Sequence, residues 1–111
     1  IAGFQMQQEK IAEMATRITK AQLLTHRVAE LKERGDLRPQ HVSMAKRNNV
    51  RTARRVARTA REILGGNGIT ADYSPMRHLA NIETVYTYEG THDVHSLILG
   101  ADLTGERAFR G

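Results

Sequence analysis

Over the first third of the chain, from Phe4 to about Arg34, apolar residues recur at the three- and four-residue spacing of one helical face, and charged residues fall largely outside it. Two interleaved series spaced by sevens make up this face: Phe4, Ile11, Ile18 and Thr25, with Met14, Ala21 and Val28 beside them. Such spacing is typical of a long bundle helix. Gly35 and Asp36 end the helix, and Pro39 keeps the connection short because the residue before a proline avoids helical geometry. The next helix should therefore be an antiparallel neighbour.

The second predicted helix runs from about Gln40 to Leu64 and has two contrasting faces. Its apolar stripe is rich in alanine, which allows close helix packing: Ala45, Asn49, Ala53, Val56, Ala60, Ile63 and Leu64. Its opposite face carries arginines: Arg47, Arg51, Arg54, Arg55, Arg58 and Arg61. Arginines in such a place are most often solvated, and binding of nucleic acid, a subunit or an acidic partner is the alternative interpretation. Aromatic residues do not interleave with the stripe, which argues against base stacking.

Two shorter helices are predicted in the remainder of the chain. The first covers about residues 75–83, with Pro75 suited to a helix start. The second covers residues 93 to about 99, and its pattern permits continuation past two glycines to Phe109. No segment longer than a few residues shows the alternating pattern of a β-strand. The predicted fold is all-α, an antiparallel helical bundle that forms a single domain over residues 1–111.

Composition narrows the class of protein. At 111 residues, with 5% aromatic residues and no tryptophan, the core must be built from small and aliphatic side chains, which favours closely packed helices. The absence of cysteine excludes disulfides and thiolate metal sites. No apolar run reaches the length of a membrane span and no signal peptide is visible, so we expect a soluble, intracellular protein. The start at Ile1 indicates a piece of a longer chain, and the net charge of +5 admits anionic partners without choosing among them.

A lone carboxylate stands at a predicted joint in residues 87–95, which read Thr-Tyr-Glu-Gly-Thr-His-Asp-Val-His. Gly90 permits a backbone conformation that a side chain would forbid, and Thr91 or Asp93 can cap the helix that follows. Glu89 can therefore be aimed into a cleft, and a carboxylate held against apolar walls has a raised pKa that suits a general base. Free N–H groups at the helix start are a usual place for a phosphate. The alternative is that Glu89 is an ordinary turn residue and Thr91 an ordinary N-cap.

The run Gly65-Gly66-Asn67-Gly68 ends the second helix. One glycine would serve as a C-terminal cap, whereas three with an asparagine indicate several left-handed or unusually close backbone positions in a row. The turn is either a sharp corner or a place where backbone lies against a flat or phosphorylated ligand, and it matches Walker and Rossmann loops poorly. We interpret His78 and His95 as helix-face or packing residues and expect no metal site around them.

Several motifs occur in order along the chain: Phe4-Gln5, the glycine run with Leu64 before it and Ile69 after it, Arg77-His78, residues 87–93, and Leu97-Ile98-Leu99-Gly100. Together they resemble the C-terminal helical domain of the acyl-CoA dehydrogenases. The sequence Glu-Gly-Thr-His-Asp, a second histidine two residues on, and the closing Thr-Gly-x-x-Ala-Phe of residues 104–109 are most similar to the glutaryl-CoA dehydrogenase branch. The resemblance covers essentially all 111 residues.

The resemblance implies that Glu89 removes the α proton of an acyl-CoA, while the β hydrogen leaves as hydride to FAD. It implies that the backbone N–H of Glu89 donates to the thioester carbonyl, and that Gly90 and Phe109 line the acyl-CoA pocket. Three residues at the following helix start would approach FAD: Thr91, His92 and Asp93. A second set would contact the FAD of a neighbouring subunit: Gln5, Glu62, Ile63, Leu64, Gly65 and Gly66.

The resemblance further implies a homotetramer that passes electrons to an electron-transfer flavoprotein and binds no nucleic acid, located in the bacterial cytoplasm or the mitochondrial matrix. Ala101 and Tyr86 depart from the arginine and asparagine that are common at these positions in the family. The family's N-terminal helical domain, middle β domain and first bundle helix are outside this chain. We therefore expect the isolated chain to be inactive, to bind FAD weakly or not at all, and to self-associate through an uncovered apolar face. The competing interpretations are a free-standing basic module that binds nucleic acid or an acidic protein through the Arg47–Arg61 stripe, and a purely structural bundle.

Overall fold

The computed structural model describes residues 1–108, and over this range the protein is all-α with no strand. Its elements are α1 (Gln5–Glu33), α2 (Pro39–Ile63), the short 3-10 helix η1 (Gly65–Ile69), α3 (Ser74–Thr87) and α4 (His92–Thr104). The predicted fold class is confirmed, as are the two long helices to within a residue or so at each end.

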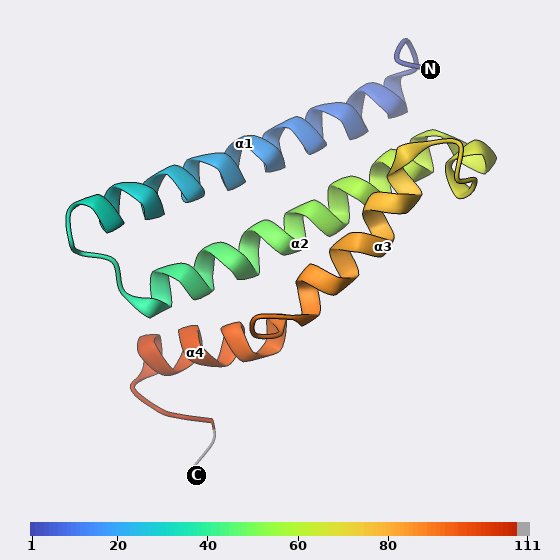
Figure 1. The fold of residues 1–111 in the computed structure, drawn as a ribbon. Helices are drawn as coiled ribbons and strands as arrows, with labels where there is room; N and C mark the ends of the chain where they lie inside the picture. Colours follow the sequence, from blue (N-terminus) through green and yellow to red (C-terminus); the bar gives the residue numbers. More distant parts are fainter. Residues whose placement is uncertain (109–111) are drawn as a thin grey trace.

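Helix α2 is the element on which the other helices pack. It lies between α1 and α3, which both run antiparallel to it, and α4 crosses the end of the bundle at which α2 begins (Figure 1). The far end of α4 is tied to the start of α2, because the carboxylate of Asp102 accepts from Arg38 at 2.8 Å and from Gln40 at 2.6 Å. The position of α4 is thus fixed relative to α2 along its length.

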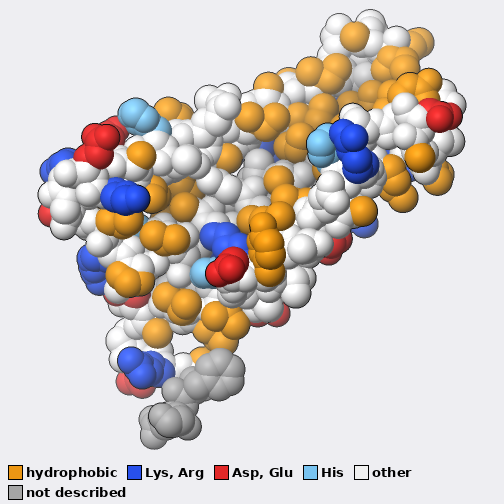
Figure 2. All heavy atoms as spheres, in the orientation of Figure 1, with side chains coloured by type: hydrophobic (Ala, Val, Ile, Leu, Met, Phe, Trp, Pro, Cys, Tyr) orange, Lys and Arg blue, Asp and Glu red, His pale blue; other side chains and the backbone are white. Residues whose placement is uncertain are grey.

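The packed interior is thin. Among residues 1–108 Val50 is the only apolar residue that is buried, and α1 has no buried residue at all. Of the two series on α1, Met14, Ala21 and Val28 are half-buried, whereas Phe4, Ile11 and Ile18 remain 69%, 42% and 40% exposed. On the face drawn in Figure 2, hydrophobic side chains accordingly reach the surface over much of the molecule.

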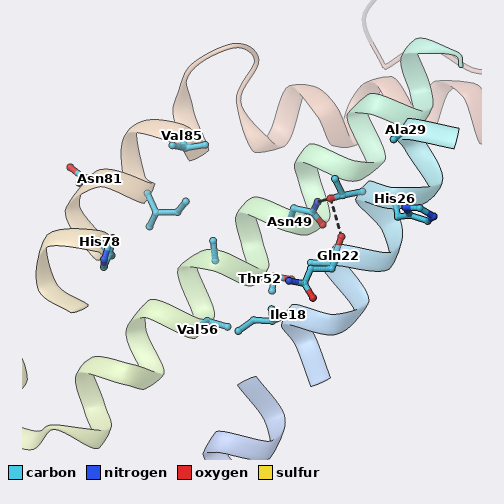
Figure 3. A pocket seen from close by; sticks show the side chains of 14 residues that line it. Ile18, Gln22, His26, Ala29, Asn49, Thr52, Val56, His78, Asn81 and Val85 are labelled. Carbon is cyan, nitrogen blue, oxygen red and sulfur yellow. Dashed lines mark hydrogen bonds between the residues drawn. The ribbon is translucent and has the colours of Figure 1, made fainter. Parts of the chain in front are cut away.

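An open groove of about 850 Å³ lies between α1 and α3, with α2 as its floor (Figure 3). Seven of its fourteen lining residues are apolar: Ile18, Ala21, Ala29, Ala53, Val56, Ile82 and Val85. Ile18 and Val56 point toward one another across the junction of α1 and α2. This groove is the uncovered apolar face that the sequence led us to expect. Self-association of the isolated chain through it stays a prediction, and a sharply monomeric, well-folded species in sedimentation would contradict it.

The two shorter helices extend further than predicted. α3 continues beyond residue 83 to Thr87, and Val85 and Tyr86 are half-buried in its last turn. α4 runs through Gly100 but ends at Thr104, since Gly105 adopts a left-handed φ of 75°. The predicted continuation to Phe109 is therefore wrong at Gly105, and Phe109 itself lies outside the described residues.

Candidate active site

Glu89 lies in the short connection between α3 and α4 with a positive φ of 53°, and no other non-glycine residue among residues 1–108 does this. A left-handed conformation costs a residue with a side chain about 1–3 kcal/mol, so the surroundings must hold it. Gly90 follows with a φ of 88°. The Glu89 side chain is exposed, and the apolar walls expected around it are not supplied by the described part of the chain.

Lys46 of α2 holds this turn through its carbonyl groups. Its Nζ donates to the carbonyl oxygens of Tyr88 and Gly90 and lies 3.4 Å from that of Glu89. The same ammonium group is 5.7 Å from the centre of the Tyr88 ring, within reach of a cation–π interaction. Three successive carbonyl groups therefore converge on one cation.

His95 of α4 braces the turn from the other side. Its Nε2 lies 3.1 Å from the carbonyl oxygen of Glu89, and its Nδ1 lies 3.0 Å from Oγ of Ser43. Because a carbonyl oxygen only accepts, Nε2 carries the hydrogen, and in the neutral ring Nδ1 accepts from the Ser43 hydroxyl. A Cβ on Gly90 would lie only 2.7 Å from Nε2, so the imidazole requires glycine at that position. His95 is thus more than the packing residue that the sequence indicated.

Thr91 is the N-cap of α4, and its Oγ accepts from the Val94 N–H at 3.1 Å, which confirms one of the two predicted caps. Asp93 lies in the first turn and is exposed. A carboxylate there stabilises the helix terminus and repels a phosphate placed at the same turn. The start of α4 therefore offers backbone N–H donors to a phosphate, while the Asp93 carboxylate repels it.

His92 is buried, 7% exposed, and stacks on Tyr86 with ring centres 4.9 Å apart. The Arg54 guanidinium lies 3.9 Å from the centre of the Tyr86 ring, and Arg51 Nη2 lies 3.4 Å from His92 Nε2. Burial, followed by the charges of Arg51 and Arg47, lowers the pKa of His92, so its ring is neutral at pH 7. Since arginine only donates, Nε2 accepts, and Nδ1 carries a hydrogen for which residues 1–108 provide no partner.

The second predicted set lies at the opposite end of the bundle. α1 begins at Gln5 near the end of α2, so Gln5 and residues 62–66 share one end of the molecule (Figure 1). Lys46, which touches the Glu89 turn, is sixteen residues before Glu62 in the sequence. At 1.5 Å per helical residue the two sets are about 24 Å apart. The structure thus separates the two predicted groups of flavin contacts.

The glycine run contains three glycines with different reasons to be there. Gly65 adopts a left-handed φ of 60°, and a Cβ on buried Gly68 would lie 2.2 Å from the carbonyl oxygen of Arg61. Exposed Gly66 has neither constraint, because a Cβ there would meet no atom within 4 Å. The described chain does not itself explain the missing side chain at Gly66, which fits a surface that another molecule approaches closely.

Half of the predicted arginine stripe makes contacts within the bundle, although Arg51 remains exposed. Arg47 donates to Ser96 Oγ at 2.8 Å, Arg51 contacts His92, and Arg54 donates to Glu83 at 2.8 Å. Exposed Arg55 and Arg58 make no ion pair with a carboxylate among the described residues. The stripe therefore attaches α3 and α4 to α2, which weakens its interpretation as a nucleic-acid surface.

Ser43 and Lys46 are the site residues that sequence reasoning missed. Both lie on a long amphipathic helix, where a lysine is ordinarily solvated and a serine carries no positional signal. Their role follows only from the return of the chain to α2 some forty residues later.

Residues 1–108 contain no cluster of three or more groups that could hold a metal ion. No helix among them is both long and apolar enough to cross a membrane.

Comparison with known proteins gives the fold and site a family. A family model described as "Acyl-CoA dehydrogenase, C-terminal domain" matches residues 1–104. The 3-(aryl)acrylate reductase of Clostridium sporogenes is 32% identical over 103 residues, which are 93% of this chain and 27% of that protein. The solved structure of glutaryl-CoA dehydrogenase from Mycobacterium smegmatis is 50% identical with a TM-score of 0.94 and covers 98% of this chain and 28% of that one. A glutaryl-CoA dehydrogenase of the same organism in complex with FADH2 is 46% identical, with the same TM-score and coverage.

The fold and site thus define a helical domain that exposes the Glu89 carboxylate on the turn between α3 and α4. The chain belongs to the acyl-CoA dehydrogenase family, and its relatives include glutaryl-CoA dehydrogenases, as the resemblance predicted. It spans little more than a quarter of the length of these relatives.

Proposed function

We propose that this chain is the C-terminal part of an FAD-dependent acyl-CoA dehydrogenase that introduces a double bond between Cα and Cβ of an acyl-CoA thioester, with glutaryl-CoA as the first substrate to test. One observation carries the proposal: Glu89 is an exposed carboxylate on a left-handed turn residue that α2 and α4 both brace. Backbone strain held in place by its surroundings is typical of functional sites. The names of the relatives support the substrate class.

In this proposal a carboxylate oxygen of Glu89 takes the α proton of the bound thioester. The backbone N–H of Glu89 donates to the thioester carbonyl oxygen and stabilises the negative charge that develops there. Bound FAD supplies the acceptor for the hydride that leaves Cβ. Gly90, and Phe109 beyond the described residues, would line the acyl-CoA pocket.

The chain's own features are compatible with two flavin contacts. At one end Thr91, His92 and Asp93 would approach FAD, and the buried Nδ1 of His92 carries a hydrogen that lacks a partner among the described residues. At the other end Gln5 and residues 62–66 would meet a second FAD, and the open space beside Gly66 suits a close approach. A distance of about 24 Å between the ends favours two flavins bound by neighbouring subunits, as in a homotetramer.

The electron acceptor in this proposal is an electron-transfer flavoprotein. The isolated chain would be inactive and bind FAD weakly or not at all, because most of the flavin and acyl pockets would come from the rest of the protein. The engaged arginines of α2 give no support to a nucleic-acid partner.

The test uses the full-length protein that contains this chain, mixed anaerobically with glutaryl-CoA while flavin absorbance is followed. We expect bleaching in the wild type, and in Glu89→Gln we expect retained flavin with reduction slowed by about 1,000-fold or more. Glu9→Gln, which changes an exposed carboxylate on α1, is the matched control and should reduce at the wild-type rate. Near-normal turnover in Glu89→Gln would remove Glu89 from the role of base.

A further inference from the structure

The turn that carries Glu89 has no backbone hydrogen bond of its own. Within residues 1–108, neither the N–H nor the carbonyl group of Glu89 or Gly90 pairs with another backbone group, although Tyr88 N–H still donates to Thr84 at the end of α3. Backbone polar groups that lack such pairing need other partners. Here the carbonyl groups find theirs in side chains from α2 and α4.

Lys46 matches this need in number and charge. An ammonium group has three donor hydrogens and no acceptor, and three carbonyl oxygens face it, those of Tyr88, Glu89 and Gly90. Converging carbonyl dipoles repel one another, and a cation at their focus offsets the repulsion. No ion pair between Lys46 and a carboxylate occurs in the described part of the chain, so the charge is directed at the turn.

The direction of the N–H groups follows from the direction of the carbonyl groups. The described chain has no cis peptide bond, and in a trans peptide the C=O of one residue points opposite to the N–H of the next. With the Tyr88 and Gly90 carbonyls turned toward Lys46, the N–H groups of Glu89 and Thr91 point away from α2. The described residues offer no acceptor to either of them.

We propose that Lys46 is a positioning residue, which holds the carbonyl groups of residues 88–90 and thereby aims the Glu89 N–H outward at the thioester carbonyl oxygen of the substrate. The inference rests on the proposed function, because it takes Glu89 as the residue that meets the acyl group. Lys46 itself is not expected to touch substrate, and the Ser43–His95 pair supports it by holding the Glu89 carbonyl.

The test uses the full-length enzyme with three variants. Lys46→Met keeps most of the aliphatic stem and removes all donors, Lys46→Gln keeps an uncharged donor group, and Lys20→Met removes an exposed lysine of α1 as the matched control. We expect kcat for flavin reduction by glutaryl-CoA to fall by about 100-fold in Lys46→Met with little change in KM, and by less in Lys46→Gln. The control should behave as wild type.

A second readout separates aiming from general damage. The infrared carbonyl stretch of an enoyl-CoA thioester bound to the oxidised enzyme falls when the Glu89 N–H donates to it, and this shift should shrink in both Lys46 variants. A wild-type kcat and a wild-type stretch in Lys46→Met would overturn the inference. If that variant does not fold, the same two results in Lys46→Gln would overturn it.

The failure of this inference can be told apart from a failure of the proposed function. The infrared shift depends on the N–H of Glu89 and not on its carboxylate, so Glu89→Gln should retain it while losing flavin reduction. Wild-type reduction in Glu89→Gln would reject the proposed base and leave the infrared result as a separate test of the role of Lys46.

Discussion

Two turns leave the ends of helices in this protein, and they keep their shapes by different means. The glycine turn of η1 (Gly65–Ile69) uses backbone freedom, with Gly65 in a left-handed conformation and Gly68 packed against the Arg61 carbonyl. The turn at Glu89 places a residue with a side chain in the left-handed region and holds it with Lys46 and His95. The conformation of the first turn is determined by the glycines of the turn itself, whereas that of the second is held by side chains of α2 and α4.

This difference distinguishes a turn that avoids backbone strain from a turn that keeps a strained residue for its side chain. At the glycine turn, strain is avoided by glycine, and Gly66 leaves an open surface. At the Glu89 turn, strain is accepted and offset, which keeps a carboxylate at a position where glycine would be the easier choice. Substitutions should therefore act locally at the first turn and through the bracing side chains at the second.

The largest effect is expected at Gly68. In Gly68→Ala the new Cβ would lie 2.2 Å from a backbone oxygen that cannot move independently of α2. We expect the free energy of unfolding of the 111-residue chain to fall by about 3 kcal/mol in urea titrations. Gly66→Ala is the matched control and should change it by at most about 0.5 kcal/mol. Equal losses of unfolding free energy in the two variants would contradict the different packing of Gly66 and Gly68.

Gly90→Ala should cost less, about 2 kcal/mol, because the clash is with a side chain that can move. The φ of 88° disfavours alanine, and the His95 ring would be displaced from the Glu89 carbonyl. Chemical shifts of the His95 imidazole should report the displacement. Gly100→Ala, at a helical glycine with open space beside it, serves as the control and should be neutral or stabilising. An undisturbed His95 in Gly90→Ala would contradict the predicted contact.

Ser43→Ala tests the bracing at a distance. Loss of the Ser43–His95 hydrogen bond should lower the free energy of unfolding by about 1 kcal/mol. Amide hydrogen exchange should accelerate at Val94 and His95, whose N–H groups donate to Thr91 beside the turn, and stay unchanged at residues 65–69. Ser74→Ala, at the exposed start of α3, should leave exchange at both turns as it is. Acceleration at both turns in Ser43→Ala would show that the brace is not local.

The smallest effect is a dependence on pH at the start of α4. Burial, then the nearby arginines, lowers the pKa of His92 in the folded state, so below pH 6.5 the unfolded state takes up a proton that the folded state resists. Stability present above pH 6.5 should decline as the pH falls toward the lowered folded pKa. We expect Tm to drop by a few degrees between pH 7.5 and 5, and to drop less in His92→Gln. An equal drop in both proteins would remove His92 as the cause.

The same contrast explains what the sequence could and could not predict. The long helices follow from their heptad spacing, the glycine turn from Gly65 and Gly68, and the cap from Thr91, because each is a local property of neighbouring residues. The exposure of Phe4 and Ile18 and the added turn of α3 depend on which faces find partners, which spacing alone does not state.

The bracing of Glu89 could not be predicted either, because it joins Ser43 and Lys46 to residues more than forty positions away. A lysine on an amphipathic helix has the same local pattern whether its ammonium is solvated or directed at three carbonyl groups. The identity of Glu89 as a candidate base came from its motif, and the conformation that makes it notable came from the structure.

The central claim is that Glu89 removes the α proton, and proton exchange at Cα tests it most directly. The full-length enzyme with oxidised flavin would be incubated in D2O with an acyl-CoA whose Cβ cannot release hydride, and deuterium at Cα would be followed by NMR. We predict incorporation with the wild type and with Glu9→Gln, and loss of incorporation by about 1,000-fold with Glu89→Gln. Incorporation at the wild-type rate in Glu89→Gln would contradict the account.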